Sequence, residues 1–157
     1  IGPDAARFYY LSKQADQHLD FDIDLAKKDS KDNVFYYIQY AYARIVSLEK
    51  KVLENNFNDD INLNSIESNN YDKCDFLIHE ISKYPDIIYK ASNSLQPHII
   101  IYYLRDLAQL LHSYYNDNHV LSESKENIQS IILCLSSVKQ VLSNGLNILK
   151  ISPINKM

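Results

Sequence analysis

Apolar residues recur along most of the chain at the spacing of one face of an α-helix. In residues 34–55 they fall on a single stripe at roughly 100° per residue: Ile38, Ala41, Ile45, Leu48 and Val52. A second stripe lies in the last part of the chain: Ile128, Ile131, Ile132, Leu135, Val138, Leu142 and Leu149. Each stripe is long enough to line a core, so the pattern predicts amphipathic helices that pack against one another.

Capping residues and prolines place the ends of further helices. Four more helices are expected, over residues 4–13, 72–84, 85–95 and 97–115. Asp4 would cap the first of these helices, and Ser122 or Ser124 would cap the last helix of the chain. Gly145 interrupts the second apolar stripe, which indicates close packing at that point.

The segments between these helices are short or polar. Residues 18–25 alternate polar and apolar side chains, which predicts a short extended segment, whereas the Asn- and Asp-rich residues 56–70 are predicted to form a loop. A polar connector at residues 29–33 separates residues 1–32 from residues 33–157. The sequence therefore predicts an all-α fold, a helical bundle preceded by a short N-terminal connecting segment.

The helix predicted over residues 34–55 carries a second face beside the apolar one. Tyr37, Tyr40 and Arg44 lie within about 60° of one another on this face, and Lys51 joins them further along. Aromatic rings stack on nucleobases, and a fixed guanidinium can pair with the acceptor edge of a base. The same residues could instead pack in the core or hold a partner helix, and the pattern alone does not decide between these roles.

Composition narrows the class of protein. At 157 residues, 46% of them hydrophobic and 23% charged, the chain has the size and balance of one globular domain. The net charge of −4 argues against a nucleic-acid surface over the whole chain but leaves room for a local basic patch. The longest apolar runs are short, as at Ile99–Ile101, so no membrane-spanning segment is predicted. The first residues contain neither an initiator Met nor a signal peptide, and we expect a piece of a longer protein.

The residue types that usually perform catalysis or bind metals do not form a recognisable motif. The spacing of Asp20, Asp22 and Asp24 matches the first ligands of a calcium-binding loop. Such a loop also needs Gly at its sixth position and Glu at its twelfth, and here these positions hold Leu25 and Lys31. The five histidines lack metal-ligand spacing, so a structural or surface role is expected for each. The two cysteines lack CxxC spacing and are expected to be small apolar side chains in a reducing compartment. Since there is no phosphate-binding loop or nucleophile motif, the sequence predicts no catalytic residue, metal or cofactor in this chain.

Several separate motifs, in the same order along the chain, resemble those of arginyl-tRNA synthetase. They cover nearly the whole sequence: Gly2–Phe8, His18–Ala26, Tyr36–Arg44, Pro97–Asn116 and Val141–Met157. The motif Tyr36–Arg44 is the most specific of them. The resemblance implies the C-terminal part of that enzyme, with residues 1–32 as the end of the catalytic region and a connector, and residues 33–157 as the α-helical anticodon-binding domain.

The resemblance also implies an activity that lies outside this chain. Enzymes of this family attach arginine to its tRNA in the cytoplasm, using ATP and Mg²⁺, and both active-site signatures of class I synthetases would lie before residue 1. We therefore expect the isolated chain to be inactive. Its expected partners are the anticodon loop of arginine tRNA and its own catalytic domain, with no membrane.

Within the family, the pocket for the anticodon loop would be formed by Tyr37, Tyr40, Arg44, Tyr115 and Met157. The central anticodon base of arginine tRNAs is cytosine, whose N3 and O2 accept hydrogen bonds. A guanidinium can donate to both atoms while the rings cover the base.

The chain departs from the family pattern at four positions outside this pocket. At the start of the helix Val34 stands in place of a Pro, and Tyr42 stands in place of a His. Ile131 stands in place of an Arg of the last helix, and Lys150 in place of a Gly.

Two alternatives remain open on the sequence. One is a helical protein-interaction module that uses the same aromatic face, and the other is a further class I synthetase, such as that for cysteine or methionine. Arg44 and the terminal Met157 argue against the latter.

Overall fold

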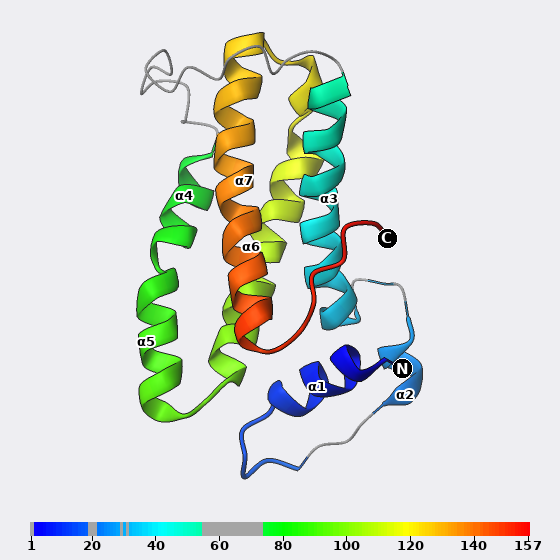
Figure 1. Cartoon of the computed structure of the whole chain (residues 1–157), viewed down its shortest axis with the longest axis vertical. Helices are drawn as coiled ribbons and strands as arrows, with labels where there is room; N and C mark the ends of the chain where they lie inside the picture. Colours follow the sequence, from blue (N-terminus) through cyan, green and yellow to red (C-terminus); the bar gives the residue numbers. More distant parts are fainter. Residues whose placement is uncertain (1, 19–21, 29, 31, 55–73) are drawn as a thin grey trace.

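The computed structural model describes residues 2–18, 22–28, 30, 32–54 and 74–157, and every regular element in these ranges is helical. The elements are α1 (Pro3–Leu11), α2 (Ile23–Ala26), α3 (Val34–Glu54), α4 (Asp75–Ser82), α5 (Tyr84–Ser94), α6 (His98–Asp117), the short 3₁₀ helix η3 (Val120–Ser122) and α7 (Lys125–Ile148) (Figure 1). The loop predicted at residues 56–70 lies outside the described residues.

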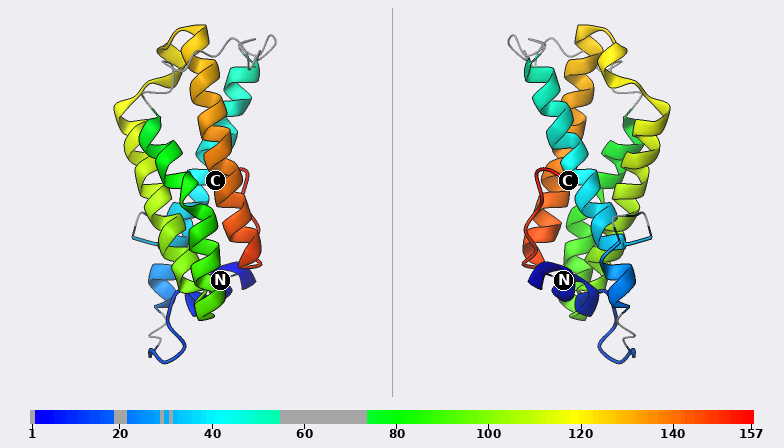
Figure 2. Two further views of the ribbon diagram at one scale, coloured as in Figure 1. Left: turned by 90° about the vertical axis from the view of Figure 1, so that its left-hand side faces the viewer. Right: turned by 90° about the vertical axis from the view of Figure 1, so that its right-hand side faces the viewer.

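Three long helices form the centre of a bundle. α3, α6 and α7 lie side by side, and α4 and α5 follow one another along α6 and α7 (Figures 1 and 2). α1 packs near one end of the bundle, against α3 and α6. The predicted all-α bundle with a short N-terminal segment is confirmed, and the chain ends beside α3 (Figure 1).

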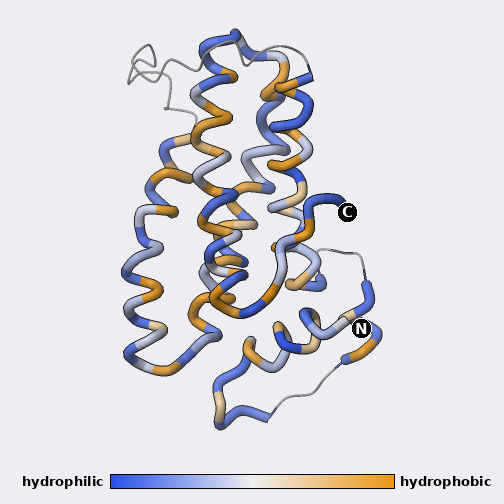
Figure 3. The backbone as a smooth tube through the Cα atoms, in the orientation of Figure 1, coloured by the Kyte–Doolittle hydropathy of each residue, from blue (hydrophilic) through white to orange (hydrophobic). Residues whose placement is uncertain are grey.

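The two predicted apolar stripes line the core. Every residue of both stripes is buried, and α6 adds a third set: Ile100, Ile101, Leu104, Leu107, Ala108 and Leu111. Figure 3 shows hydrophobic positions recurring between hydrophilic ones along these helices. Burial of this apolar surface is the main force that holds α3, α6 and α7 together.

Gly145 lies at a close approach of α6 and α7. A Cβ atom placed on Gly145 would lie 2.7 Å from Cδ2 and 3.0 Å from Cδ1 of Leu104. Because the Leu104 side chain is fully buried, it has little room to move away. The close packing that the sequence predicted at Gly145 is therefore confirmed.

The C-terminal tail folds back along α3 (Figure 1). Lys150 begins this reversal with a φ of 58°, in the left-handed region that glycine adopts most easily. The buried amide of Gln39 then donates to the Ser152 carbonyl (2.9 Å) and accepts from the Ile154 amide (2.9 Å). One α3 side chain thus holds the backbone of the tail in place.

α1 differs from its predicted form at both ends, and it also contacts the tail. Its N-cap is Gly2 rather than Asp4, and the helix ends before the predicted residue. Asp4 instead accepts hydrogen bonds from Arg7 (3.1 Å) and from the backbone amide of Ser152 (2.9 Å). Arg7 also donates to the carbonyl of Lys150. These bonds tie the N-terminal helix to the C-terminal tail.

The prediction of an extended segment at residues 18–25 was wrong for the last of these residues, because they belong to the helix α2. Asn33 holds this turn because its amide donates to the carbonyls of Ala26 (3.1 Å) and Lys28 (2.8 Å). Its side-chain oxygen accepts from the Tyr9 hydroxyl (2.9 Å). These hydrogen bonds stabilise the turn at α2, although the local alternation of polar and apolar residues favours an extended segment.

The other helix ends lie within a few residues of their predicted places. α4 begins at Asp75, and Pro97 is the N-cap of α6. Of the two serines proposed as the cap of α7, Ser124 has this role and accepts from the Asn127 amide (3.3 Å). Ser122 belongs to η3.

The hydropathy of α7 bears on the expectation that no segment spans a membrane. By length and hydropathy alone, α7 passes the test for a helix that could cross a membrane, and among the described residues it is the one helix that does. Helices in the cores of ordinary bundles pass the same test. α7 packs against α3, α4 and α6 and buries its apolar stripe there, so its hydropathy is accounted for by the core.

We expect Gly145→Ala to destabilise the fold. The added methyl would overlap Leu104, and this overpacking outweighs the gain in helix propensity, for a net loss of about 1–2 kcal/mol in the free energy of unfolding. Urea denaturation followed by circular dichroism measures the change. Asn147→Ala, at an exposed position of the same helix, is the control. A Gly145→Ala variant as stable as the parent chain would contradict the close approach.

We expect Lys150→Gly to stabilise the fold by about 1 kcal/mol, because glycine adopts a positive φ without steric cost. Lys150→Ala removes the same charge but keeps a Cβ atom, so it should give no such gain. The same denaturation experiment compares the two variants. Equal stability of the Gly and Ala variants would show that the backbone is not strained at this position.

Candidate functional site

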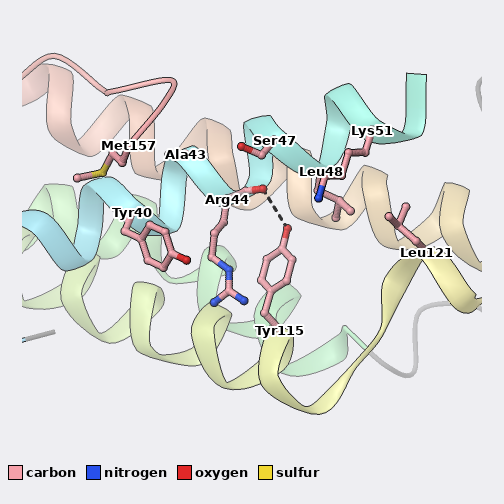
Figure 4. A pocket seen from close by; sticks show the side chains of 9 residues that line it. All are labelled: Tyr40, Ala43, Arg44, Ser47, Leu48, Lys51, Tyr115, Leu121 and Met157. Atoms are coloured by element: carbon pink, nitrogen blue, oxygen red, sulfur yellow. Dashed lines mark hydrogen bonds between the residues drawn. The ribbon is translucent and has the colours of Figure 1, made fainter. Parts of the chain in front are cut away.

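A cavity of about 340 Å³ opens between α3, the end of α6, η3 and the C-terminal tail. Its lining residues are Tyr40, Ala43, Arg44, Ser47, Leu48, Lys51, Tyr115, Leu121 and Met157 (Figure 4). Four of the five residues assigned to the pocket from sequence therefore line one cavity: Tyr40, Arg44, Tyr115 and Met157. Residues far apart in the chain meet here because α3, α6 and the tail pack together.

The guanidinium of Arg44 is held between aromatic rings. Its Cζ atom lies 4.4 Å from the centroid of the Tyr115 ring and 5.5 Å from that of Tyr40. The Tyr115 hydroxyl also donates to the backbone carbonyl of Arg44 (3.5 Å), which links α6 to α3 (Figure 4). Cation–π contacts of this kind orient a guanidinium while leaving most of its N–H groups available.

His112 provides the hydrogen-bond acceptor that fixes Arg44. Its Nδ1 lies 3.2 Å from Nη1 of Arg44, and its Nε2 lies 3.2 Å from the carbonyl oxygen of Tyr37. A guanidinium only donates and a carbonyl only accepts, so both contacts are hydrogen bonds when His112 is neutral with its proton on Nε2. Burial lowers the pKa of His112; the bond to Tyr37 opposes this shift and the charge of Arg44 adds to it. The neutral acceptor form is thereby favoured.

Sequence reasoning gave His112 only a structural or surface role, and it missed this function. A single histidine produces no periodic signal. The usable clue was its position three residues before Tyr115, which places both side chains on one face of α6.

The structure separates the roles of Tyr37 and Tyr40. Tyr40 is 37% exposed, lines the cavity, and stacks at 5.4 Å on the ring of His112. The Tyr37 ring lies 4.4 Å from that of His112, packs against the core, and is not among the lining residues. Burial raises the pKa of Tyr37, and the Arg44 charge partly offsets this shift. Tyr37 therefore supports the site from behind.

Tyr115 and Met157 complete the walls. Burial is the main cause that raises the pKa of Tyr115, so its phenol stays neutral, although the Arg44 charge works in the opposite direction. Met157 is 47% exposed and reaches the cavity because Gln39 fixes the tail. A thioether is a flexible apolar wall that can adapt to the face of a ring.

The charges around the cavity are positive. Arg44 and Lys51 both line it. Of the two acids on α3, Glu49 is turned towards α7, where it accepts from Ser136 (2.6 Å) and from Lys139 (2.5 Å), and Glu54 is the last residue of the helix. Two cationic residues thus line this cavity, which is compatible with the local basic patch that the net charge left open.

The cysteines and Ile131, which the sequence also singled out, lie in the core and not at this cavity. Cys74 and Cys134 are buried and form no disulfide bond, as expected for small side chains in the core, and the Cys74 thiol also donates to the Tyr114 hydroxyl (3.7 Å). Ile131 is also buried in the core and cannot face a ligand. Within the described residues, no group of three or more His, Cys, Asp or Glu side chains could hold a metal ion.

Residues 38–157 match the family model of the DALR anticodon binding domain. Over its whole length the chain is 44% identical to an arginine–tRNA ligase of Legionella pneumophila, of which it spans 27%. It is 41% identical, over 97% of its length, to an arginine–tRNA ligase of Acinetobacter baylyi, of which it spans 26%. The chain thus corresponds to about a quarter of these relatives.

Solved structures agree with these matches. A crystal structure of a candidate arginyl-tRNA synthetase from Campylobacter jejuni is similar with a TM-score of 0.83 and 30% identity, over all of this chain and 34% of that one. Thermus thermophilus arginyl-tRNA synthetase shares the fold with a TM-score of 0.78 at 22% identity, over 98% of this chain and 26% of that one. These matches give no support to a general protein-interaction module. The chain belongs to the DALR anticodon-binding domain family, in the form found in arginine–tRNA ligases.

Proposed function

We propose that this chain binds the anticodon loop of arginine tRNA, and that the cavity at Arg44 receives the central anticodon base. The observation that carries the proposal is the guanidinium of Arg44, fixed between Tyr40 and Tyr115 and bonded to His112 beside an open cavity. This arrangement offers hydrogen-bond donors and flat apolar surfaces together, which a single-stranded base needs.

The proposed readout depends on the polarity of hydrogen bonds. Cytosine presents acceptors at N3 and O2, and Arg44 has N–H donors beyond the one directed at His112. Uracil carries a donor at N3, which would face a group that can only donate. The rings of Tyr40 and Tyr115 and the side chain of Met157 would cover the base faces, while Tyr37 holds His112 in place.

The proposal extends to the protein that contains this chain. Residues 33–157 would be the anticodon-binding domain, and residues 1–32 would connect it to a catalytic domain. That parent protein would attach arginine to its tRNA in the cytoplasm with ATP and Mg²⁺. The chain itself would position the tRNA and carry no aminoacylation activity.

We expect Arg44→Ala to remove the preference for a central cytosine. The discrimination lost should be about 1–3 kcal/mol, the size expected for a paired hydrogen-bond contact to a base edge. Filter-binding competition between arginine tRNA and a variant changed only at the central anticodon base measures this preference. Arg105→Ala, which removes an exposed arginine stacked on Tyr102 away from the cavity, is the matched control. Equal weakening of both tRNAs by Arg44→Ala would contradict the proposed role.

We expect the same preference to weaken as the pH falls. The pKa of His112 lies below its ordinary value of 6.5, so the neutral acceptor is present above that lowered pKa. Below it, protonation removes the acceptor and places a second cation against Arg44, so discrimination and the stability contributed by this bond are both lost. The competition assay repeated between about pH 5 and 8 follows this change. His112→Phe should abolish the pH dependence, and an identical pH profile in that variant would contradict the assignment.

A further inference from the structure

The C-terminal tail supplies one wall of the Arg44 cavity. The other described lining residues lie on α3, α6 or η3, whereas Met157 follows residues 151–156, which belong to no helix (Figure 4). Such a segment has no helical hydrogen bonds of its own to fix its course. The place of Met157 therefore depends on the side chains that hold the tail.

Two helices hold the tail at the same residue, Ser152. Its backbone amide donates to Oδ2 of Asp4 in α1 (2.9 Å), and its carbonyl accepts from the side chain of Gln39 in α3 (2.9 Å). Arg7 of α1 adds a hydrogen bond to the carbonyl of Lys150. Both backbone groups of Ser152 are thus fixed, one by each helix.

The carboxylate of Asp4 is oriented for this contact. Its Oδ1 accepts from Nη1 of Arg7 (3.1 Å), which leaves Oδ2 to accept from Ser152. A hydrogen bond to an ionised acceptor is stronger than one between neutral groups. The ion pair of Asp4 and Arg7 is partly exposed, and pairs of this kind contribute little to stability by themselves. The placement of the tail is therefore the better account of these two side chains.

α1 is a firm support for the tail because it is attached to the bundle by its own apolar face. Phe8 is buried, and its ring lies 5.4 Å from that of Phe35, at the start of α3. α1 also precedes residue 38, the first residue that the family model matches. A helix outside the matched region thus takes part in shaping the cavity.

We propose that Asp4 and Arg7 are positioning residues for base recognition. They would hold the tail where Met157 closes the Arg44 cavity, so that a helix of the N-terminal connector takes part in binding the base. This inference rests on the proposed function, because the central anticodon base is the group that Met157 would cover.

Filter binding of arginine tRNA to the full 157-residue chain tests this role. Asp4→Ala should weaken binding roughly three- to tenfold, which corresponds to the loss of one hydrogen bond. Asp4→Asn should keep more of the affinity than Asp4→Ala, because its side-chain oxygen can still accept from Ser152. Asp86→Ala is the matched control, since Asp86 also follows a proline in the first turn of a helix, at the start of α5.

A double-mutant cycle with Met157→Ala separates a positioning role from a general loss of stability. If Asp4 acts through the placement of Met157, Asp4→Ala weakens binding less in the Met157→Ala background than in the unchanged chain. A purely structural effect would be equal in both backgrounds. Thermal melts followed by circular dichroism establish that each variant is folded. Arg7→Ala takes the place of Asp4→Ala in the cycle if the latter is unfolded.

Three results would each refute the positioning role. They are Asp4→Ala binding tRNA as well as Asp86→Ala does, Met157→Ala binding as well as the unchanged chain does, and full additivity of the two losses. In all three cases the proposed function stands as long as the unchanged chain prefers a central cytosine. If the unchanged chain shows no such preference, the proposed function itself fails.

Discussion

The guanidinium of Arg44 has to be held in one orientation, and the rest of the site depends on this constraint. An arginine side chain on an exposed helix face has many rotamers, and ordering it costs about 2 kcal/mol. Here the Tyr115 ring, the Tyr40 ring and the neutral His112 restrict it before any ligand arrives. Restriction in the free protein reduces the entropy that binding must overcome, and it fixes which atoms of a ligand the N–H groups can reach.

This restriction is a product of how α3 and α6 pack. His112 and Tyr115 come from α6, and each makes a hydrogen bond to a backbone carbonyl of α3, at Tyr37 and Arg44. α6 is in turn set close to α7 by the absence of a side chain at Gly145. The tail that carries Met157 is attached to α3 through Gln39. A bundle built from ordinary apolar stripes thus acquires one rigid polar site at its surface.

Much of this arrangement follows from the sequence. The recurrence of apolar residues every 3.6 positions predicted the long helices and their core residues, and helical geometry placed Tyr37, Tyr40 and Arg44 on one face of α3. The sequence of α3 could not show that Tyr37 lies behind His112, because that depends on where α6 crosses α3. The turn at α2 depends on the side chain of Asn33, and the tail depends on a buried glutamine and on a lysine with positive φ. These are bonds between distant residues, which no local pattern records. The pocket residues themselves came from resemblance to a family rather than from periodicity.

The most direct test of the Arg44 readout removes one acceptor atom from the base. Arginine tRNA with 3-deazacytidine at the central anticodon position lacks N3 but keeps O2 and the ring. Its dissociation constant, compared with that of unmodified tRNA, is measured for the unchanged chain and for Arg44→Ala. If Arg44 donates to N3, the modification weakens binding to the unchanged chain by about 1 kcal/mol or more and has no further effect on the variant. Equal weakening of both proteins by the modification would contradict the account.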